Sequence, residues 1–438
     1  MRLRPRNILL VGNASLALVA SPALGQAAPA SPSRCSVSEV TRHRLAVEGN
    51  LNFYVEPVAL AESGGDVLLA GTPNVLWNRA PGEQASPVII DSLFGAVIAG
   101  DGRARTVESP IPARLLSSIR ALGRGDGSWD VVFAELPARE SARPDTAARL
   151  WYGRYDGRRW ASVEQLPVPA GTHLHPVHSS PLVRRGDTLF WAVGASTPGH
   201  NMDVVTLFRR RGAEWQAEIA PTRGAGYPVV AYSDSLGLLL AVVRADPRWE
   251  NPDSSRGGYD QNSLFLYARQ PTWRILRRVA HGVTAPVDHP SFVRSGTNLV
   301  LSWAVETANG SEARAILDVD DGPPDLIVVL DPAFGGHPPV RSLAMPGGHH
   351  LWITRHIPDS ASSSQLRFVG TAGQGVSLIG HLPSPFFGGF GASSGGGSDV
   401  LLAGLDPEYI DHRGGRVSFV HSLLVRVRIT CSPGVTRR

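Results

Sequence analysis

One short unit recurs seven times along the chain, at a mean spacing of about 55 residues. Each unit is a turn that contains glycine or polar residues, followed at once by a short apolar run. The units are anchored at Gly65, Gly127, Gly186, Ser235, Gly296, Gly348 and Gly397. A short apolar run between turn residues is typical of a strand that is buried on both faces. A repeat of this length favours a fold that is built from copies of one supersecondary unit.

Three tryptophans share this period. Trp160, Trp215 and Trp273 each follow a turn, and they are separated by 55 and 58 residues. The first of them comes after an Asp156-Gly157 turn, which is typical of a β-hairpin. We expect the three indole rings to pack between neighbouring units rather than to stack on a ligand.

A residue followed by proline precedes most of the glycine turns. Because proline lacks the N–H that a strand ladder uses, we expect it at the first residue of an inner strand. A unit then has four strands: an inner strand, a buried second strand and two outer strands joined by the tryptophan hairpin. The pairs are Glu56-Pro57, His175-Pro176, Tyr227-Pro228, His289-Pro290 and His337-Pro338.

Four-stranded units with little helix between them predict an all-β fold, a β-propeller with seven four-stranded blades. Six blades remain an alternative, because the second unit is irregular and has no proline pair. The 47 glycines and 35 prolines agree with this interpretation, since both residues break helices and serve turns. We therefore interpret residues 35–438 as one propeller domain.

The two ends of the chain are predicted to meet in the last blade. The seventh unit offers an inner strand at 400–403 and a long strand at 417–430, and residues 391–395 are interpreted as a glycine-rich turn. Residues 37–47 are expected to supply the missing outermost strand, which places Cys35 against Cys431. These are the only two cysteines, so we expect a disulfide that closes the ring; the alternative is two unrelated buried thiols.

The first 25 residues have the pattern of a secretory signal peptide. Arg2, Arg4 and Arg6 precede an apolar stretch at 8–20, and small residues suit cleavage before Gln26. Residues 26–34 then form a short linker, and the protein is expected to be secreted or periplasmic. No later segment approaches the length of a membrane helix.

The charge of the mature chain excludes one class of partner. Loss of the three leader arginines lowers the formal net charge from +4 to +1. Nucleic-acid binding requires a clustered positive face, so we expect none. We expect a monomer that binds a glycan or a small extracellular ligand, without a cofactor.

Ionisable residues mark one face of the predicted ring. In a propeller, the loop before each inner strand and the loop after each second strand open on the same face, around the central channel. Such convergence indicates a binding site, although each residue could instead cap a strand at a wet rim. The residues before inner strands are Glu56, His175, His178, Tyr227, Asp288, His289 and His337. The residues after second strands are Glu135, Arg244, Asp246, Glu306, Arg355, His356 and Asp406.

Two subsets of these residues suggest specific chemistry. Asp288 and Glu306 form the best carboxylate pair, because one precedes and the other follows strands of the fifth unit, and glycoside hydrolysis uses two carboxyl groups. His175, His289 and His337 are equivalent in three units and could face one axis. They lack the tight spacing of a strong metal motif, so no metal is predicted.

The first unit resembles the opening of sialidase-like propellers. Phe53-Tyr54-Val55-Glu56-Pro57 followed by a glycine turn and an apolar strand is similar to their aromatic-Arg-Ile-Pro element. The chain departs from that pattern where Val55 replaces the substrate-binding arginine, and it lacks regular Asp-boxes. The resemblance implies a propeller, usually of six blades, and an ancestry among glycan-processing enzymes.

Three functions follow from these observations. The first is a propeller that binds a glycan on its channel face and is not a standard sialidase. The second is a glycoside hydrolase or lyase that uses Asp288 and Glu306 with neighbouring arginines and histidines. The third is a non-catalytic scaffold for other proteins. A carboxylate pair with an arginine in a deep pocket favours the enzyme, and a plugged channel favours the scaffold.

Overall fold

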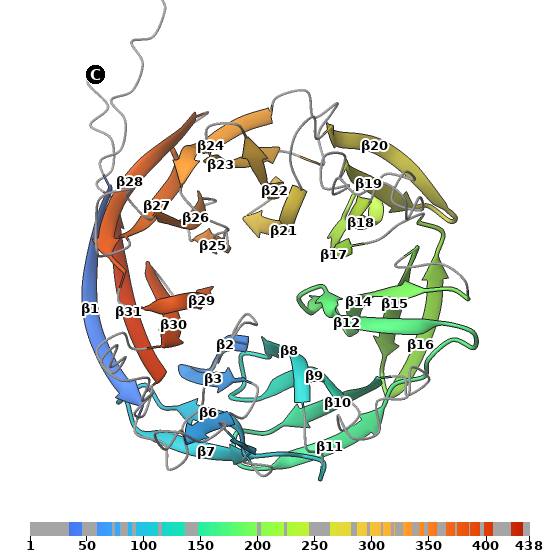
Figure 1. Cartoon of the computed structure of the whole chain (residues 1–438), viewed down its shortest axis with the longest axis horizontal. Helices are drawn as coiled ribbons and strands as arrows, with labels where there is room; N and C mark the ends of the chain where they lie inside the picture. The colour runs from blue at the N-terminus through green and yellow to red at the C-terminus, as the bar shows by residue number, and fades with distance from the viewer. Residues whose placement is uncertain are drawn as a thin grey trace, which may run out of the picture.

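The structure, a computed structural model of the 438-residue chain, is all β in the part that it describes (Figure 1). No helix among these residues is long and apolar enough to cross a membrane. The described residues are 35–45, 59–71, 75–78, 86–89, 93–112, 116–135, 148–198, 203–222, 226–244, 263–281, 287–295, 298–307, 310–316, 319, 327–334, 341–345, 349–356, 365–372, 375–384, 386–394, 398–405 and 422–431.

The strands form seven four-stranded antiparallel blades, which are numbered in chain order. The strands of each blade are given from the innermost to the outermost. Blade 1 has β2 (Ala59–Ser63), β3 (Asp66–Ala70), β6 (Leu93–Ile98) and β7 (Ala104–Glu108). Blade 2 has β8 (Leu116–Gly123), β9 (Trp129–Glu135), β10 (Arg149–Tyr155) and β11 (Trp160–Gln165). Blade 3 has β12 (His173–Ser179) with the short β13 (Val183–Arg185), β14 (Thr188–Ser196), β15 (Val204–Arg211) and β16 (Glu214–Ala220).

The remaining blades repeat the same order. Blade 4 has β17 (Gly226–Ser233), β18 (Gly237–Arg244), β19 (Ser263–Arg269) and β20 (Trp273–His281). Blade 5 has β21 (Val287–Ser295), β22 (Asn298–Thr307), β23 (Gly310–Ile316) and β24 (Ile327–Phe334). Blade 6 has β25 (Arg341–Met345), β26 (His349–His356), β27 (Gln365–Ala372) and β28 (Gly375–Pro383). Blade 7 has β29 (Phe387–Ser394), β30 (Asp399–Leu405), β31 (Ser422–Cys431) and β1 (Cys35–Leu45).

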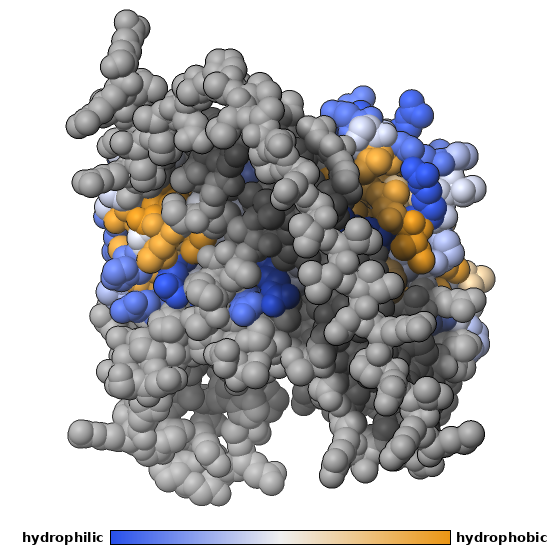
Figure 2. Space-filling view, turned by 90° about the horizontal axis from the view of Figure 1, so that it is seen from above, coloured by the Kyte–Doolittle hydropathy of each residue, from blue (hydrophilic) through white to orange (hydrophobic). Residues whose placement is uncertain are grey.

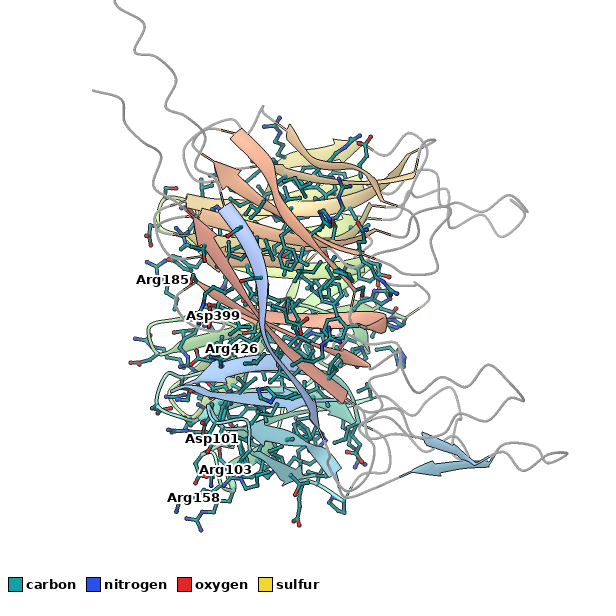
Figure 3. All side chains as sticks on the ribbon, turned by 90° about the vertical axis from the view of Figure 1, so that its left-hand side faces the viewer. Asp101, Arg103, Arg158, Arg185, Asp399 and Arg426 are labelled. Carbon is teal, nitrogen blue, oxygen red and sulfur yellow. The ribbon has the colours of Figure 1, made fainter. Side chains whose placement is uncertain are left out.

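The seven innermost strands contact one another around a complete circle, in the order β2, β8, β12, β17, β21, β25, β29 and back to β2 (Figure 1). The prediction of a seven-bladed propeller is therefore confirmed, and the alternative of six blades is wrong. Blade 1 carries an insertion between β3 and β6, in which β4 (Val75–Asn78) and β5 (Ser86–Ile89) pair with each other as a separate two-stranded sheet. This small sheet stands away from the ring (Figure 3).

Each second strand is buried on both faces because each blade packs between two others. Successive side chains of a strand point to opposite faces. Along β9, Val131 and Phe133 join a core cluster with blade 1, whereas Val132 and Ala134 join a cluster with blade 3. The continuous apolar runs after the glycine turns are therefore the strands between two cores, as the sequence predicts.

The tryptophan hairpins of blades 2, 3 and 4 each fasten their blade to the one before it, which confirms their structural role. The Trp160 indole N–H donates to the carbonyl oxygen of Glu108 in blade 1 at 2.9 Å. The Trp215 N–H donates to Glu164 Oε1 in blade 2 at 3.1 Å. Trp273 repeats the bond with Glu218 Oε1 in blade 3, also at 3.1 Å.

In the three proline pairs that the structure describes, the proline lies inside the inner strand and not at its first residue, so the prediction is wrong there; Pro57 and Pro338 lie outside the described residues. Pro176, Pro228 and Pro290 each stand where the pairing register of the inner strand shifts. A β-bulge leaves its extra residues out of the hydrogen-bond ladder, so the missing N–H of proline costs nothing there. The proline marks a bulge rather than a beginning.

The last blade is completed by the N-terminal strand, as predicted, but its inner strand is not the expected one. β29 is innermost, and the apolar run at 400–403 belongs to the second strand, β30. The segment interpreted as a turn therefore extends a strand, because Phe386 and Phe390 anchor it in the core beside glycines. β1 pairs antiparallel with β31 along the outer edge, with Cys35 directly opposite Cys431 in the backbone register.

Apolar side chains remain exposed at scattered points on the outer strands. The most exposed large ones, Ile275 and Leu378, lie on β20 and β28, which belong to different blades. Seen edge-on, apolar residues of the described surface lie in separate regions among hydrophilic ones (Figure 2). In this view, the apolar residues of the described part of the chain do not form one continuous patch.

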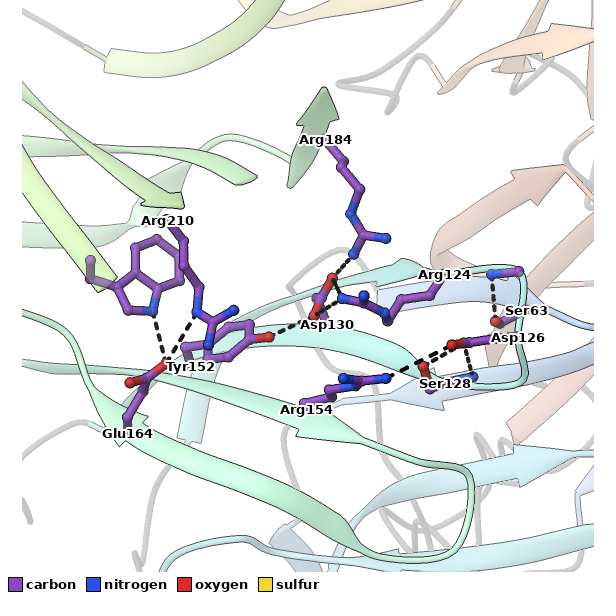
Figure 4. A network of polar contacts seen from close by, with 12 residues as sticks. Ser63, Arg124, Asp126, Ser128, Asp130, Tyr152, Arg154, Glu164, Arg184 and Arg210 are labelled. Atoms are coloured by element: carbon purple, nitrogen blue, oxygen red, sulfur yellow. Dashed lines mark hydrogen bonds and ion pairs between the residues drawn. The ribbon is translucent and has the colours of Figure 1, made fainter. Parts of the chain in front are cut away.

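A buried carboxylate ties blade 2 to blade 3. Asp130, at the start of β9, is completely buried and accepts a hydrogen bond from the Tyr152 hydroxyl at 2.6 Å (Figure 4). Arg124 Nη1 lies 3.2 Å from both carboxylate oxygens, and Arg184 of blade 3 forms an ion pair with the same carboxylate. Burial raises the pKa of the Tyr152 hydroxyl, which keeps it a donor. A charge that is out of water needs such partners.

We expect Asp130→Asn to lower the free energy of unfolding by about 3–5 kcal/mol, because it leaves two guanidinium groups facing a neutral amide. Denaturant titration measures this change. Asp234→Asn is the matched control. Asp234 pairs at 2.9 Å with Arg185, the residue after Arg184, but the Asp234 side chain is 84% exposed. The control should change stability by less than about 1 kcal/mol. Equal effects of the two variants would contradict the assignment.

Candidate functional site

Inner strands begin and second strands end at the same edge of each blade, which we call the channel face. The backbone register shows this in blades 2 to 7, where the first paired residue of the inner strand lies opposite the end of the second strand. The pairs are Leu116 with Glu135, His173 with Ser196, Gly226 with Val243, Val287 with Val305, Arg341 with Ile353 and Phe387 with Leu405.

Two of the predicted residues meet across the boundary between blades 3 and 4. The rings of His178 on β12 and Tyr227 on β17 lie edge to face, with centroids 4.5 Å apart and planes at 72°. Both residues are partly exposed. The structure thus brings together an imidazole and a phenol, which are both able to move protons.

The backbone at these two residues departs from regular strand geometry. His175 pairs with Gly194 and Ser179 with Val193, so three residues that include His178 lie in a wide bulge. Tyr227 has a φ of 46°, in the left-handed region that residues other than glycine rarely occupy. Such a conformation costs about 1–3 kcal/mol, and it is commonest at sites where function requires it. Bulges likewise redirect side chains beside active sites.

A second histidine, His175, lies three residues before His178 on the same strand. His175 Nε2 lies 2.6 Å from Ser196 Oγ, at the end of the second strand of the same blade. The His173 ring is 5.1 Å from the His175 ring. Burial lowers the pKa of His175, and the charge of His173 lowers it further. His175 therefore favours its neutral form at neutral pH.

Sequence reasoning missed Arg120, which lies on β8 at the neighbouring boundary, between blades 2 and 3. Its Nη2 donates to the carbonyl oxygen of Ser179, next to His178, at 3.4 Å, and its Nη1 donates to that of Ile119 at 3.0 Å. Arg120 follows Ser118, which has a φ of 53° in the bulge of β8. The sequence separation from the glycine turn could have indicated this bulge. Ser118 stands nine residues before Gly127, much as Tyr227 stands ten residues before Gly237.

Two predicted residues lie at the channel-face edge but away from this contact. Glu135 Oε2 accepts a hydrogen bond from the Trp151 indole N–H at 3.0 Å and lies 3.9 Å from Arg149 Nη1, so it serves the rim of blade 2. Arg355 belongs to β26 of blade 6, where burial lowers the pKa of its guanidinium. Both of these partners of Glu135 belong to β10 of its own blade.

The other predicted residues are placed only in part. Asp288 pairs with Ala304 in the register of blade 5, and Glu306 stands two residues further along the same neighbouring strand. The backbone also places Arg244, His289 and His356 in β18, β21 and β26. Glu56, Asp246, His337 and Asp406 lie outside the described residues. Among the residues that are described, no group of three or more His, Cys, Asp or Glu side chains could hold a metal ion.

The chain matches no protein-family model and no curated protein, but solved structures share its fold. The polysaccharide lyase Uly1 matches with a TM-score of 0.52 at 11% identity, over 88% of this chain and 94% of that one. An ulvan lyase of family PL25, solved with -[GlcA(1-4)Rha3S]- bound, matches with a TM-score of 0.53 at 8% identity, over 87% and 95%. At these identities the matches establish the fold.

A subtype N10 neuraminidase-like protein of the strain A/little yellow-shouldered bat/Guatemala/060/2010 also matches, with a TM-score of 0.37 at 10% identity, over 80% of this chain and 100% of that one. This similarity is too low to support an argument. The propeller architecture that the sialidase-like resemblance implies is confirmed, whereas its usual count of six blades is not.

The lowered pKa of His175 makes a prediction about stability. The folded state binds a proton at this ring less readily than the unfolded chain, whose histidines titrate near pH 6.5. Its contribution to stability is therefore complete above about pH 6.5 and is lost as the pH falls through the lower, folded pKa. We expect His175→Gln to reduce the drop in denaturation midpoint between about pH 7.5 and 5.5. His381→Gln, on an exposed position of β28, is the control. Equal pH slopes in wild type and His175→Gln would refute the prediction.

Proposed function

We propose that the protein binds an acidic polysaccharide across its channel face and cleaves it by β-elimination at His178 and Tyr227. The observation that carries the proposal is the edge-to-face contact of these two side chains, from different blades, with Tyr227 in a left-handed conformation. The two polysaccharide lyases of the same fold support the proposal, because each match covers most of this chain and nearly all of the lyase.

The proposed reaction needs one base and one acid. The base removes the proton on C5 of a uronate, a C4=C5 double bond forms, and the glycosidic oxygen on C4 leaves with a proton from the acid. No other reactant is consumed. An imidazole is a base near neutral pH and a phenol keeps its proton there, so we assign His178 as the base and Tyr227 as the acid.

The substrate must present a carboxylate that a cation can neutralise, because loss of the C5 proton places charge on that group. Arg120 is suited to this role, since its guanidinium is fixed by the carbonyl oxygens of Ile119 and Ser179 and lies beside the chain at His178. A guanidinium also binds a carboxylate or a sulfate in two-pronged geometry. The proposed ligand is therefore an acidic glycan rather than a neutral one.

The cellular setting follows from the leader. We propose that residues 1–25 direct export and are removed, and that the mature protein works in the periplasm or outside the cell, where polysaccharides are met. A distant relationship to sialidase-like propellers agrees with the first unit, and Val55 in place of the sialidase arginine argues against sialidase activity. The proposed enzyme acts as a monomer without a cofactor.

His178→Asn and Tyr227→Phe should each reduce the rate of elimination by about 10²-fold or more, because each removes a proton-transfer group. The test is incubation with uronate-containing polysaccharides, read by the ultraviolet absorbance of the unsaturated product. Tyr227→Phe keeps the ring that contacts His178, so folding should be unchanged.

Two matched controls separate catalysis from folding. Tyr232→Phe alters another tyrosine of β17, whose ring lies under Arg185, and His381→Asn alters an exposed histidine of β28. Both controls should keep wild-type activity. Wild-type rates in either His178→Asn or Tyr227→Phe would contradict the assignment of that residue. Failure to bind or cleave any acidic polysaccharide would contradict the function and favour a protein-binding scaffold.

Hydrolysis by Asp288 and Glu306 is a second candidate. The specific observation in its favour is the register of blade 5, which brings the two positions to neighbouring strands, two residues out of direct opposition. Two carboxyl groups on either side of a glycosidic bond are what hydrolysis requires.

If hydrolysis is the activity, Glu306→Gln should reduce it by about 10²-fold or more while leaving the fold intact. Reducing ends would then form without an unsaturated product, which distinguishes this reaction from elimination. Glu312→Gln is a control on the adjacent β23, where Glu312 pairs with Arg314 at 2.7 Å. Unchanged hydrolysis in Glu306→Gln would remove this residue from the mechanism.

A further inference from the structure

The N-terminal strand β1 contacts three blades at the point where the ring closes. It forms the outer edge of blade 7 by pairing with β31 (Figures 1 and 3). Near its start, Val37 lies so close to Gly380 of blade 6 that a Cβ on the glycine would come within 3.0 Å of Val37 Cγ2. Near its end, the His43 ring approaches Gly102 of blade 1 equally closely. β1 therefore bridges the first blade and the last two.

Among the described strands, none pairs with the outer edge of β1, which is the last strand in the order of its sheet. Val37 packs into the shared core of blades 6 and 7, while the following residues from Ser38 to Val40 are exposed. Edge strands fray more easily than strands with two neighbours. β1 is thus held by its ladder with β31 and by side-chain contacts with blades 6 and 1.

The first residue pair in the register of β1 and β31 consists of two cysteines. Cys35 is the first residue of β1, Cys431 is the last residue of β31, and the two are direct partners. Directly opposed residues of an antiparallel pair have Cα atoms about 4.5 or 5.5 Å apart, and both values lie in the range of about 4.4–6.8 Å that a disulfide spans. The chain has no other cysteine.

We propose that Cys35 and Cys431 form an intramolecular disulfide that locks the ring closed. Each thiol loses one proton and one electron, an S–S bond forms, and the two electrons reduce a disulfide oxidant such as oxidised glutathione to two thiols. The bond closes a loop of about 400 residues, so it removes much conformational freedom from the unfolded chain. The ring joint then becomes covalent, and stability becomes dependent on the redox state.

The test begins with the full-length mature protein after oxidative folding. Peptide mapping without reductant should recover one linked peptide that contains both cysteines, and reductant should split it. Reduction should lower the melting temperature by about 3–7 °C. It should also speed proteolytic cleavage at the start of β1, where the strand is released.

A double variant supplies the control. Cys35→Ser with Cys431→Ser should melt at the temperature of the reduced wild type, and reductant should not change it further. Two free thiols in the oxidatively folded protein, or a disulfide-linked dimer on a non-reducing gel, would overturn the proposal. Mapping of the wild-type protein keeps the test decisive even where the double variant fails to fold. A lyase assay on the same samples is independent, because the linkage is read by mass alone.

Discussion

Closure of the ring is the constraint on which the other contacts depend. Each blade buries both faces of its second strand against its neighbours, as Val131 and Val132 of β9 show. A chain of seven blades that did not close would leave one apolar face of blade 1 and one of blade 7 in water. The pairing of β1 with β31 prevents this, because a strand from one end of the chain completes the blade at the other end.

The channel face shows how a rigid ring can hold a strained site. Tyr227 keeps a left-handed backbone at a cost of about 1–3 kcal/mol, which only the surrounding packing can sustain. Blade 3, which carries His178, is also fixed to blade 2 away from the channel face, where Asp130 joins Arg184 of blade 3 to Arg124 of blade 2. A buried ion pair of this kind fixes the positions of its side chains more than it adds to the net stability of the fold.

The architecture could be predicted from sequence because it repeats, whereas the site could not because it departs from the repeat. The glycine turns, the three tryptophans and the meeting of Cys35 with Cys431 all follow from one period and an antiparallel pairing. β29 was missed because its glycines are typical of a turn. In the folded protein, Phe386 and Phe390 bury this segment in the core, and it forms a strand. Arg120 was missed because it adjoins the bulge of β8, and periodicity carries no information about bulges. Glu135 is at its predicted edge, yet its carboxylate serves Trp151.

The bulges also explain why proline recurs before the glycine turns. An inner strand has a hydrogen-bonded neighbour on one side only, and a bulge further reduces the N–H groups that need partners, so proline is tolerated at that point. In blades 4 and 5 the residue before the proline, Tyr227 or His289, is also held out of the regular ladder. In blade 4 this residue is Tyr227, whose ring meets His178 from the bulge of blade 3. The same backbone irregularity therefore accounts for the proline in the sequence and for the side chains that the channel face presents to a ligand.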